Sequence, residues 1–368
     1  MLKISNSNIR NIPHTKNVNF KGKIIDMHAH TGSLSDTIKF GSDALDVFVK
    51  EPLQNGDTVE KMIVSNLDSI VDGGRLNEIE GNKAILEICK SNPKLSPLAV
   101  CQPARTDGNP NEIRKLLSTN KFAGLKFHPL RLMLNADDRL YDAYLELAKE
   151  KNLPCLFHSE VALEWGKDGS CKFSSNINPS DPRLIYNLAK RHPTVPVILG
   201  HTGAGGDLAH QKAIGIIVDS IKNNDAKLYA DISWIDFAPN GSPEYPKKNL
   251  IDLIKKLKQL GKTDRILFGT DAPLGCYGSQ NPISNLPPKQ AYEKTVDVIK
   301  SAIRENFDDA EDLIHKIFYQ NAQDLFFAPK TQKIVKNTNQ KLAGILALAA
   351  ALVTGAAIYL HSKMHARS

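Results

Sequence analysis

The sequence predicts an α/β protein folded as a (β/α)8 TIM barrel, followed by a hydrophobic C-terminal helix. Strand-like apolar runs alternate with helical patterns along the chain, as in successive β/α units. Several of these runs end on histidine or aspartate, and the carboxyl ends of barrel strands meet on one face. The 368 residues are enough for one large barrel with short additional segments.

Eight predicted strands alternate with helices in chain order. The strands cover 24–30, 61–67, 98–102, 124–128, 153–158, 195–201, 227–233 and 265–271. Helical patterns, with apolar residues at three- and four-residue steps, cover 111–119, 140–151, 181–191, 209–223, 248–260 and 310–327. Long connections, which would line the catalytic face of a barrel, cover 31–58, 160–180, 234–247 and 272–289. An open doubly wound sheet is the alternative, but such sheets usually carry a glycine-rich nucleotide loop after the first strand.

The composition is that of an ordinary globular protein, with 41% hydrophobic and 24% charged residues. The net charge of +7 comes from lysines dispersed along the chain, so we expect no nucleic-acid partner. The five cysteines are an odd number without C-x-x-C spacing, which argues against a disulfide framework and a thiolate zinc site. A reducing compartment, the cytoplasm, is therefore predicted for the catalytic domain.

The two ends of the chain differ in character. Residues 1–20 lack the apolar centre of a secretory signal and are predicted to be a flexible leader before a barrel at 21–328. After a polar linker at 329–341, residues 342–360 are uncharged and about long enough to cross a hydrocarbon core of about 30 Å. More lysines precede this stretch than follow it in 361–368, so we expect membrane contact with the barrel on the cytoplasmic side.

Two alternatives for the C-terminal stretch remain open. An alanine-rich helix of this kind could instead pack on the barrel or on another protomer. Small residues at Ala343, Ala347 and Ala351 would also let two such helices pair, which makes a homodimer a further expectation.

His28 and His30 end the first predicted strand and indicate a metal site. Residues two apart on a strand project to the same side, with Cα atoms about 7 Å apart, so both imidazoles can reach one ion. A polar pair bonded to each other inside the barrel is the alternative for this motif alone. His158 ends another apolar strand, and since burial of an unpaired imidazole is costly, it needs a partner. Asp271 ends the last strand and would add an anionic ligand.

Histidine and carboxylate ligands suit Zn²⁺ best, with Mn²⁺, Fe²⁺ or Co²⁺ as alternatives. His201 ends the strand after that of His158; it could bind metal, but an acid/base role is favoured. Asp271 is expected to share that catalytic role. The predicted substrate contacts are Lys126, His128, Arg105, Arg131 and Trp234. Lys126 could alternatively be carboxylated and bridge a second metal, and Trp234 could simply pack in the core.

These motifs resemble the amidohydrolase superfamily, in particular the branch that includes the aminocarboxymuconate-semialdehyde decarboxylase-like enzymes. The similar segments are His28-Ala29-His30, Gly124-Leu125-Lys126-Phe127-His128-Pro129, the strand ending at His158, Gly200-His201-Thr202-Gly203, Phe268-Gly269-Thr270-Asp271-Ala272-Pro273 and Asn321-Ala322-Gln323-Asp324-Leu325-Phe326. The resemblance implies a distorted barrel with one divalent metal, usually zinc. It implies His28, His30, His158 and Asp271 as the ligands, with His201 beside the catalytic water.

The predicted function is metal-dependent hydrolysis of a C–N or C–O bond in a small, anionic substrate. A non-oxidative decarboxylase on the same barrel is the alternative reaction. An inactive, membrane-tethered scaffold is the alternative of a different class, which the complete set of ligand residues argues against.

Overall fold

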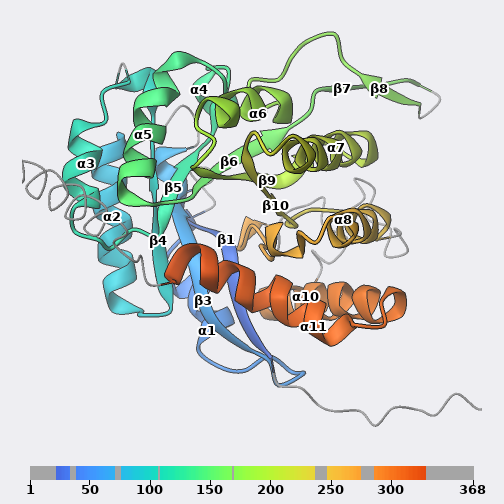
Figure 1. Cartoon of the computed structure of the whole chain (residues 1–368). Helices are drawn as coiled ribbons and strands as arrows, with labels where there is room; N and C mark the ends of the chain where they lie inside the picture. The colour runs from blue at the N-terminus through green and yellow to red at the C-terminus, as the bar shows by residue number, and fades with distance from the viewer. Residues whose placement is uncertain are drawn as a thin grey trace, which may run out of the picture. The chain divides into compact units, whose positions relative to one another are not determined.

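A computed structural model describes residues 22–33, 39–70, 76–106, 108–167, 170–236, 247–274 and 286–328 (Figure 1). Its main sheet follows the order β11-β10-β9-β6-β5-β4-β3-β1-β2, and every pair except β1 with β2 is parallel. The strands are β1 Lys23–Ser33, β2 Lys39–Phe40, β3 Thr58–Asn66, β4 Leu95–Val100, β5 Gly124–Phe127, β6 Cys155–Glu160, β9 Pro196–Ala204, β10 Lys227–Asp231 and β11 Ile266–Leu267. A mixed α/β fold with a parallel sheet is thus confirmed.

Backbone hydrogen bonds join the two sides of this sheet. Met27 N donates to Phe268 O at 3.0 Å, and Asp271 N donates to His28 O at 2.8 Å. Ala29 also forms an isolated parallel bridge with Ala272. Because β1 thereby pairs with the segment after β11, the strand order is consistent with the predicted TIM barrel. The closure brings the His28 and Asp271 ends of the sheet together.

The helices lie around the strands in Figure 1. They are α1 Ser42–Val49, α2 Glu78–Ser91, α3 Asn111–Leu117, α4 Pro129–Leu132, α5 Asp142–Lys151, α6 Pro182–Arg191, α7 Asp207–Asn223, α8 Lys248–Gln259, α10 Pro288–Asn306 and α11 Ala310–His315. Alternate residues of β1 enter different apolar clusters: Ile24 joins the large cluster shared with the helices, and Ile25 and Met27 join a smaller one. Phe326 packs in the smaller cluster, so the end of the domain covers apolar strand residues.

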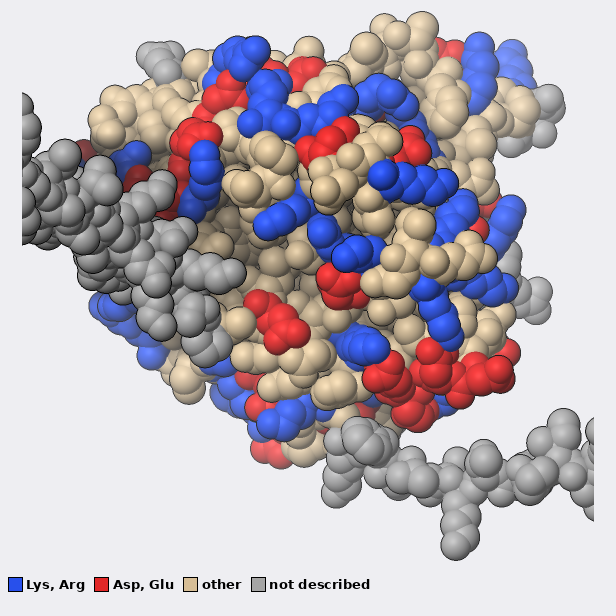
Figure 2. Space-filling view, viewed as in Figure 1, with Lys and Arg blue, Asp and Glu red and all other residues tan. Residues whose placement is uncertain are grey.

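Several elements differ from those expected. Helices α2 and α10 were not predicted, and α1 lies inside the expected loop 31–58. The expected loop 160–180 contains an antiparallel hairpin, β7 Leu163–Trp165 with β8 Cys171–Phe173. Figure 1 shows this hairpin projecting beyond α6 and α7. On the face drawn in Figure 2, basic and acidic side chains are intermixed, in keeping with dispersed lysines.

The prediction of a membrane-spanning helix is corrected. Among the residues that the structure describes, no helix combines the length and apolar character needed to cross a bilayer. The predicted span 342–360 lies outside the described residues, as do the leader 1–20, the linker 329–341 and the tail 361–368. The expected membrane contact, the membrane-tethered scaffold and the helix-paired homodimer therefore have no support from the structure.

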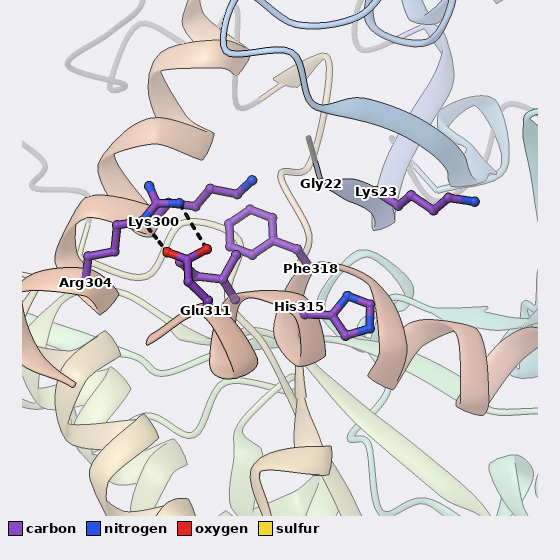
Figure 3. A pocket seen from close by; sticks show the side chains of 8 residues that line it. Gly22, Lys23, Lys300, Arg304, Glu311, His315 and Phe318 are labelled. Atoms are coloured by element: carbon purple, nitrogen blue, oxygen red, sulfur yellow. Dashed lines mark hydrogen bonds and ion pairs between the residues drawn. The ribbon is translucent and has the colours of Figure 1, made fainter. Parts of the chain in front are cut away.

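A small pocket lies beside the amino end of β1, at Gly22 and Lys23 (Figure 3). Three of the charged residues that line it, Lys300, Arg304 and Glu311, form ion pairs. Arg304 Nε donates to Glu311 Oε1 at 2.6 Å, and the buried Lys300 ammonium donates to the buried Asp57 carboxylate. Asp57 also accepts the backbone N–H of Gly22 at 2.8 Å. A buried ion pair holds this end of the sheet. We expect the residues here to stabilise the fold rather than to take part in catalysis.

Replacement of Lys300 by methionine is expected to cost about 3–5 kcal/mol of unfolding free energy, because it leaves the Asp57 carboxylate buried and unpaired. Urea denaturation would measure the loss. Lys316→Met is the matched control, since Lys316 pairs with Asp312 on the surface and should cost less than about 1 kcal/mol. Equal, small losses for both variants would show that the buried pair contributes little.

Candidate metal centre

His28 of β1, His201 of β9 and Asp271, which follows β11, lie close together. One ring nitrogen of each histidine and one oxygen of Asp271 all lie within 4.8 Å of one another. The three residues are 1%, 5% and 7% exposed. We call them the inner cluster. A cation with bonds of about 2.1 Å needs ligand atoms about 3–4 Å apart, so the cluster is close to the separation that one ion requires.

His30 adjoins the inner cluster through Asp271. Its Nε2 lies 2.9 Å from Asp271 Oδ1, and His28 Nε2 lies 3.4 Å from the same oxygen. Burial opposes ionisation of Asp271, but the neighbouring His28 and His30 outweigh it and hold its pKa well below the usual range. Burial lowers the pKa of His30 to about 4 and that of His201 well below its usual value. Neutral imidazoles beside an ionised carboxylate are a donor set for a divalent cation.

His158 lies beside the inner cluster but is not one of its members. Its Nε2 is 3.2 Å from Glu160 Oε2, and its ring stacks on His128 with centroids 3.9 Å apart. The His158 and His201 rings meet edge to face at 5.1 Å. Burial lowers the pKa of both His158 and His128. The structure thus places His128 against a predicted ligand.

Lys126 lies inside the centre rather than at its entrance. The side chain is only 1% exposed, and its Nζ is 2.8 Å from His28 Nε2. Burial lowers the pKa of Lys126 to about 8, although the carboxylates of Asp271 and Asp231 favour its charged form. The lysine is therefore still mostly an ammonium ion at neutral pH.

The other predicted substrate contacts lie farther out. Arg105 ends a 3₁₀ helix at Pro103–Arg105 and is exposed. Arg131 is exposed on α4, and its charge is one cause of the lowered pKa of His128. Trp234 is half-buried, and its indole Nε1 donates to Asp271 Oδ2 at 2.8 Å. Trp234 thus binds the expected catalytic carboxylate.

Two residues that belong to the site were not predicted: Asp231, the last residue of β10, and Ser233, just after it. Asp231 Oδ2 is 2.7 Å from His28 Nδ1, and Ser233 Oγ is 2.9 Å from His201 Nδ1. Burial opposes ionisation of Asp231, yet His28 lowers its pKa to about 2. The signal was present in the sequence, because Asp231 ends an apolar run just as His158 and Asp271 do.

The backbone is left-handed at three of these positions, with φ of 61° at His201 and 60° at both Trp234 and Asp271. Such a conformation costs about 1–3 kcal/mol per non-glycine residue and tends to occur at functional sites. Gly269 allows a close approach of three strands. A Cβ atom there would lie 2.4 Å from Asp231 Oδ1 and 2.9 Å from His28 Cβ.

Gly269→Ala is therefore expected to force Asp231 and His28 apart and to weaken metal binding by about 10–100-fold, the usual cost of disturbing an outer contact of a ligand. Competition with a chromogenic chelator would measure the affinity. Gly215→Ala is the control, because a Cβ on that helical glycine meets no atom within 4 Å. Unchanged affinity in Gly269→Ala would show that the contact between Asp231 and His28 is not needed.

Comparison with known proteins gives one family match. The profile of a family described as amidohydrolase matches residues 25–328. No curated protein matches the sequence.

Solved structures share the fold at low sequence identity. A probable 2-pyrone-4,6-dicarboxylic acid hydrolase from Acinetobacter baumannii is 16% identical, with a TM-score of 0.53, over 82% of this chain and 98% of that chain. A 2,6-dihydroxybenzoate decarboxylase from Rhizobium is 16% identical, with a TM-score of 0.52, over 83% and 98%. A 5-carboxyvanillate decarboxylase from Novosphingobium aromaticivorans, solved with bound manganese, is 12% identical, with a TM-score of 0.53, over 83% and 97%.

Proposed function

Because this chain belongs to the amidohydrolase family, we propose that it is a metal-dependent hydrolase that cleaves a C–N or C–O bond in a small anionic substrate. The observation that carries the proposal is the convergence of His28, His201 and Asp271, whose ligand atoms lie within 4.8 Å of one another. The matched region, residues 25–328, includes every residue of the centre and all of the described strands except the first two residues of β1.

The donor set fits one divalent cation, most readily Zn²⁺, with Mn²⁺, Fe²⁺ or Co²⁺ as alternatives. His28, His30, His158 and Asp271 would hold it. His158 would offer Nδ1, because its Nε2 lies against Glu160, whose carboxylate only accepts hydrogen bonds. The chemistry that such a cation supplies is a lowered pKa of water and polarisation of a carbonyl group.

The chain's own residues would handle the protons. Asp271 is ionised and can accept a proton from the attacking water, then pass it to the leaving group. Trp234 holds Oδ2 of this carboxylate, which leaves Oδ1 turned toward the imidazoles. His201 is neutral and can take up a proton and return it during turnover.

A carboxylate-bearing substrate is favoured by the charges around the centre. Lys126 places a buried ammonium ion 2.8 Å from His28, and Arg131 and Arg105 lie exposed after β5 and β4. Proteins of similar fold are named for acidic substrates: a pyrone dicarboxylic acid, a dihydroxybenzoate and a carboxyvanillate. We propose that Lys126 binds the substrate carboxylate.

A screen of carboxylate-bearing lactones, cyclic imides and amides with the metal-loaded protein tests this function. Turnover is expected for the free acids and should fall strongly for the matching methyl esters, which lack the charge. Lys126→Met should lose the preference for the acid. Equal turnover of acids and esters would contradict the anionic substrate, and failure of every compound class would contradict hydrolysis.

Decarboxylation is the second candidate, and the buried ammonium of Lys126 is the observation that favours it. A carboxylate bound beside His28 and Asp271 could itself be the group that leaves. Release of CO₂ without consumption of water would identify this reaction, whereas incorporation of ¹⁸O from water into the product would identify hydrolysis.

The proposed location is the cytoplasm. The described cysteines Cys89, Cys101, Cys155 and Cys171 are all free. Burial raises the pKa of Cys89 to about 12 and that of Cys101 well above its usual value, as expected of packed rather than reactive thiols. Free thiols of this kind suit a reducing compartment.

A further inference from the structure

We propose that segment 231–234, which begins at the last residue of β10, positions all three side chains of the inner cluster while contributing no ligand itself. The contacts are Asp231 with His28 at 2.7 Å, Ser233 with His201 at 2.9 Å, and Trp234 with Asp271 at 2.8 Å. This inference rests on the proposed function, because the contacts of segment 231–234 orient residues of the proposed metal centre. One short segment thus sets the orientation of residues from three other parts of the barrel.

The hydrogen bonds of Asp231 determine where the protons of two imidazoles lie. A carboxylate only accepts, and Oδ2 lies 2.7 Å from His28 Nδ1 and 2.6 Å from Ser233 Oγ, so both groups donate to it. Because the single hydroxyl proton of Ser233 points at Asp231, its oxygen accepts from His201 Nδ1. Both rings therefore carry their proton on Nδ1 and have an unprotonated Nε2.

A separate contact agrees with this assignment. Lys126 Nζ lies 2.8 Å from His28 Nε2, and an ammonium group can only donate. His28 Nε2 must then be the nitrogen without a proton. The contacts on the two edges of this ring lead to the same tautomer.

Trp234 orients the third member. An indole N–H is a donor only, so it fixes Oδ2 of Asp271 as its acceptor at 2.8 Å. The other oxygen, Oδ1, then faces His30 and His28. Without the indole N–H, the carboxylate would be freer to rotate, since this terminal torsion has a broad minimum.

His30 is a contrast within the site, because the hydrogen bonds of its two ring nitrogens go to Asp271 and Ser65 rather than to segment 231–234. Its Nε2 lies 2.9 Å from Asp271 Oδ1, which only accepts, so Nε2 carries the proton. Its Nδ1 then accepts from Ser65 Oγ at 2.8 Å. His30 would have to move this proton to Nδ1 before Nε2 could bind a cation, whereas Nε2 of His28, the other proposed ligand on β1, already lacks a proton.

The segment is suited to hold these groups rigidly. Asp231 and Ser233 are buried, and Ser233 N donates to Asp231 Oδ1 at 2.9 Å. His201 N donates to Oδ2 of the same carboxylate at 3.0 Å. Four donors therefore surround Asp231. Asparagine has the same shape, but its NH₂ group would replace one of the two carboxylate oxygens. This group cannot accept the hydrogen bonds that the replaced oxygen accepts.

Long-range ¹H–¹⁵N NMR of metal-free, ¹⁵N-histidine-labelled protein tests the assignment in the unaltered full chain. We expect the Nδ1–H tautomer at His28 and His201 and the Nε2–H tautomer at His30. Addition of Zn²⁺ should change the protonated nitrogen of His30 alone. An Nε2–H tautomer at His28 or His201 in the metal-free protein would overturn the proposal.

Variants test the consequence for metal binding. Asp231→Asn and Trp234→Phe should each weaken Co²⁺ affinity by about 10–100-fold and alter the visible absorption of the Co²⁺ protein. Trp165→Phe makes the same chemical change at a tryptophan that is 59% exposed on the β7 strand, and it should leave affinity unchanged. Unchanged affinity in both Asp231→Asn and Trp234→Phe would refute the positioning role.

Ser233 supplies a readout that a purely structural role would not move. Ser233→Ala should give a mixture of His201 tautomers in the NMR spectrum, and Ser233→Thr, which keeps the hydroxyl, should restore the single tautomer. A single Nδ1–H tautomer in Ser233→Ala would contradict the role of Ser233. Absence of metal binding or turnover in the unaltered protein would refute the proposed function, whereas the tautomers of its metal-free form would still decide the positioning.

Discussion

Replacement of Asp271 by asparagine is expected to lower kcat/KM by at least about 10³-fold, toward the upper end of what a proton-transfer group contributes. The change keeps the shape of the side chain but removes the charge that faces His30 at 2.9 Å and His28 at 3.4 Å. It also removes the proton acceptor for the attacking water. Steady-state kinetics and metal analysis of the purified variant would measure both effects, and both turnover and bound metal should fall.

The matched control is Asp252→Asn, the same chemical change in a carboxylate that pairs with Lys256 on the surface of α8. This variant should retain full turnover and metal content. Circular dichroism should show both variants folded, because the bottom of the barrel is untouched. Full turnover in Asp271→Asn would remove this carboxylate from the mechanism.

Removal of divalent metal is expected to abolish turnover and to lower the melting temperature. Burial lowers the pKa of the proposed ligands His30 and His158, and Asp271 is ionised, so these three ligands need no deprotonation before a cation binds. A cation present at about 1,000 times its Kd would stabilise the fold by about 4 kcal/mol. Activity and thermal melting after dialysis against a chelator, and again after addition of Zn²⁺, would measure both changes.

His158→Ala provides the internal check on metal removal. This variant lacks one proposed ligand, so Zn²⁺ should stabilise it less than the unaltered protein at the same concentration. If turnover persists in protein that elemental analysis shows to be metal-free, the metal-dependent mechanism is wrong. If Zn²⁺ stabilises His158→Ala as strongly as the unaltered chain, His158 is not a ligand.

These polar positions were predictable because each follows or ends an apolar run. Burial of a polar side chain there costs free energy unless the side chain has a partner. The strand that ends with His28 and His30, and those that carry His158 and His201, occur in the structure as β1, β6 and β9. An imidazole at the end of such a run demands a partner, and the parallel arrangement supplies it. This local signal does not depend on knowing the tertiary packing.

Contacts across the barrel were not predictable in the same way. The spacing places His158 at a strand end, but not the Glu160 carboxylate that takes its Nε2 or the stacking on His128. Likewise, the hydrogen bond from the Trp234 indole to Asp271 joins residues 37 positions apart, which the periodicity of a single element does not reveal. The α1 helix was not predicted, because helix propensity over only eight residues is a weak signal. Such a short helix depends on tertiary packing for its stability.

The most direct test of the centre is anomalous X-ray diffraction at the zinc edge from crystals of the purified, full-length protein. The account predicts one strong anomalous peak within bonding distance, about 2.0–2.2 Å, of His28, His30, His158 and Asp271. A peak elsewhere, or no peak in protein that is catalytically active, would contradict the claim that these residues share one cation.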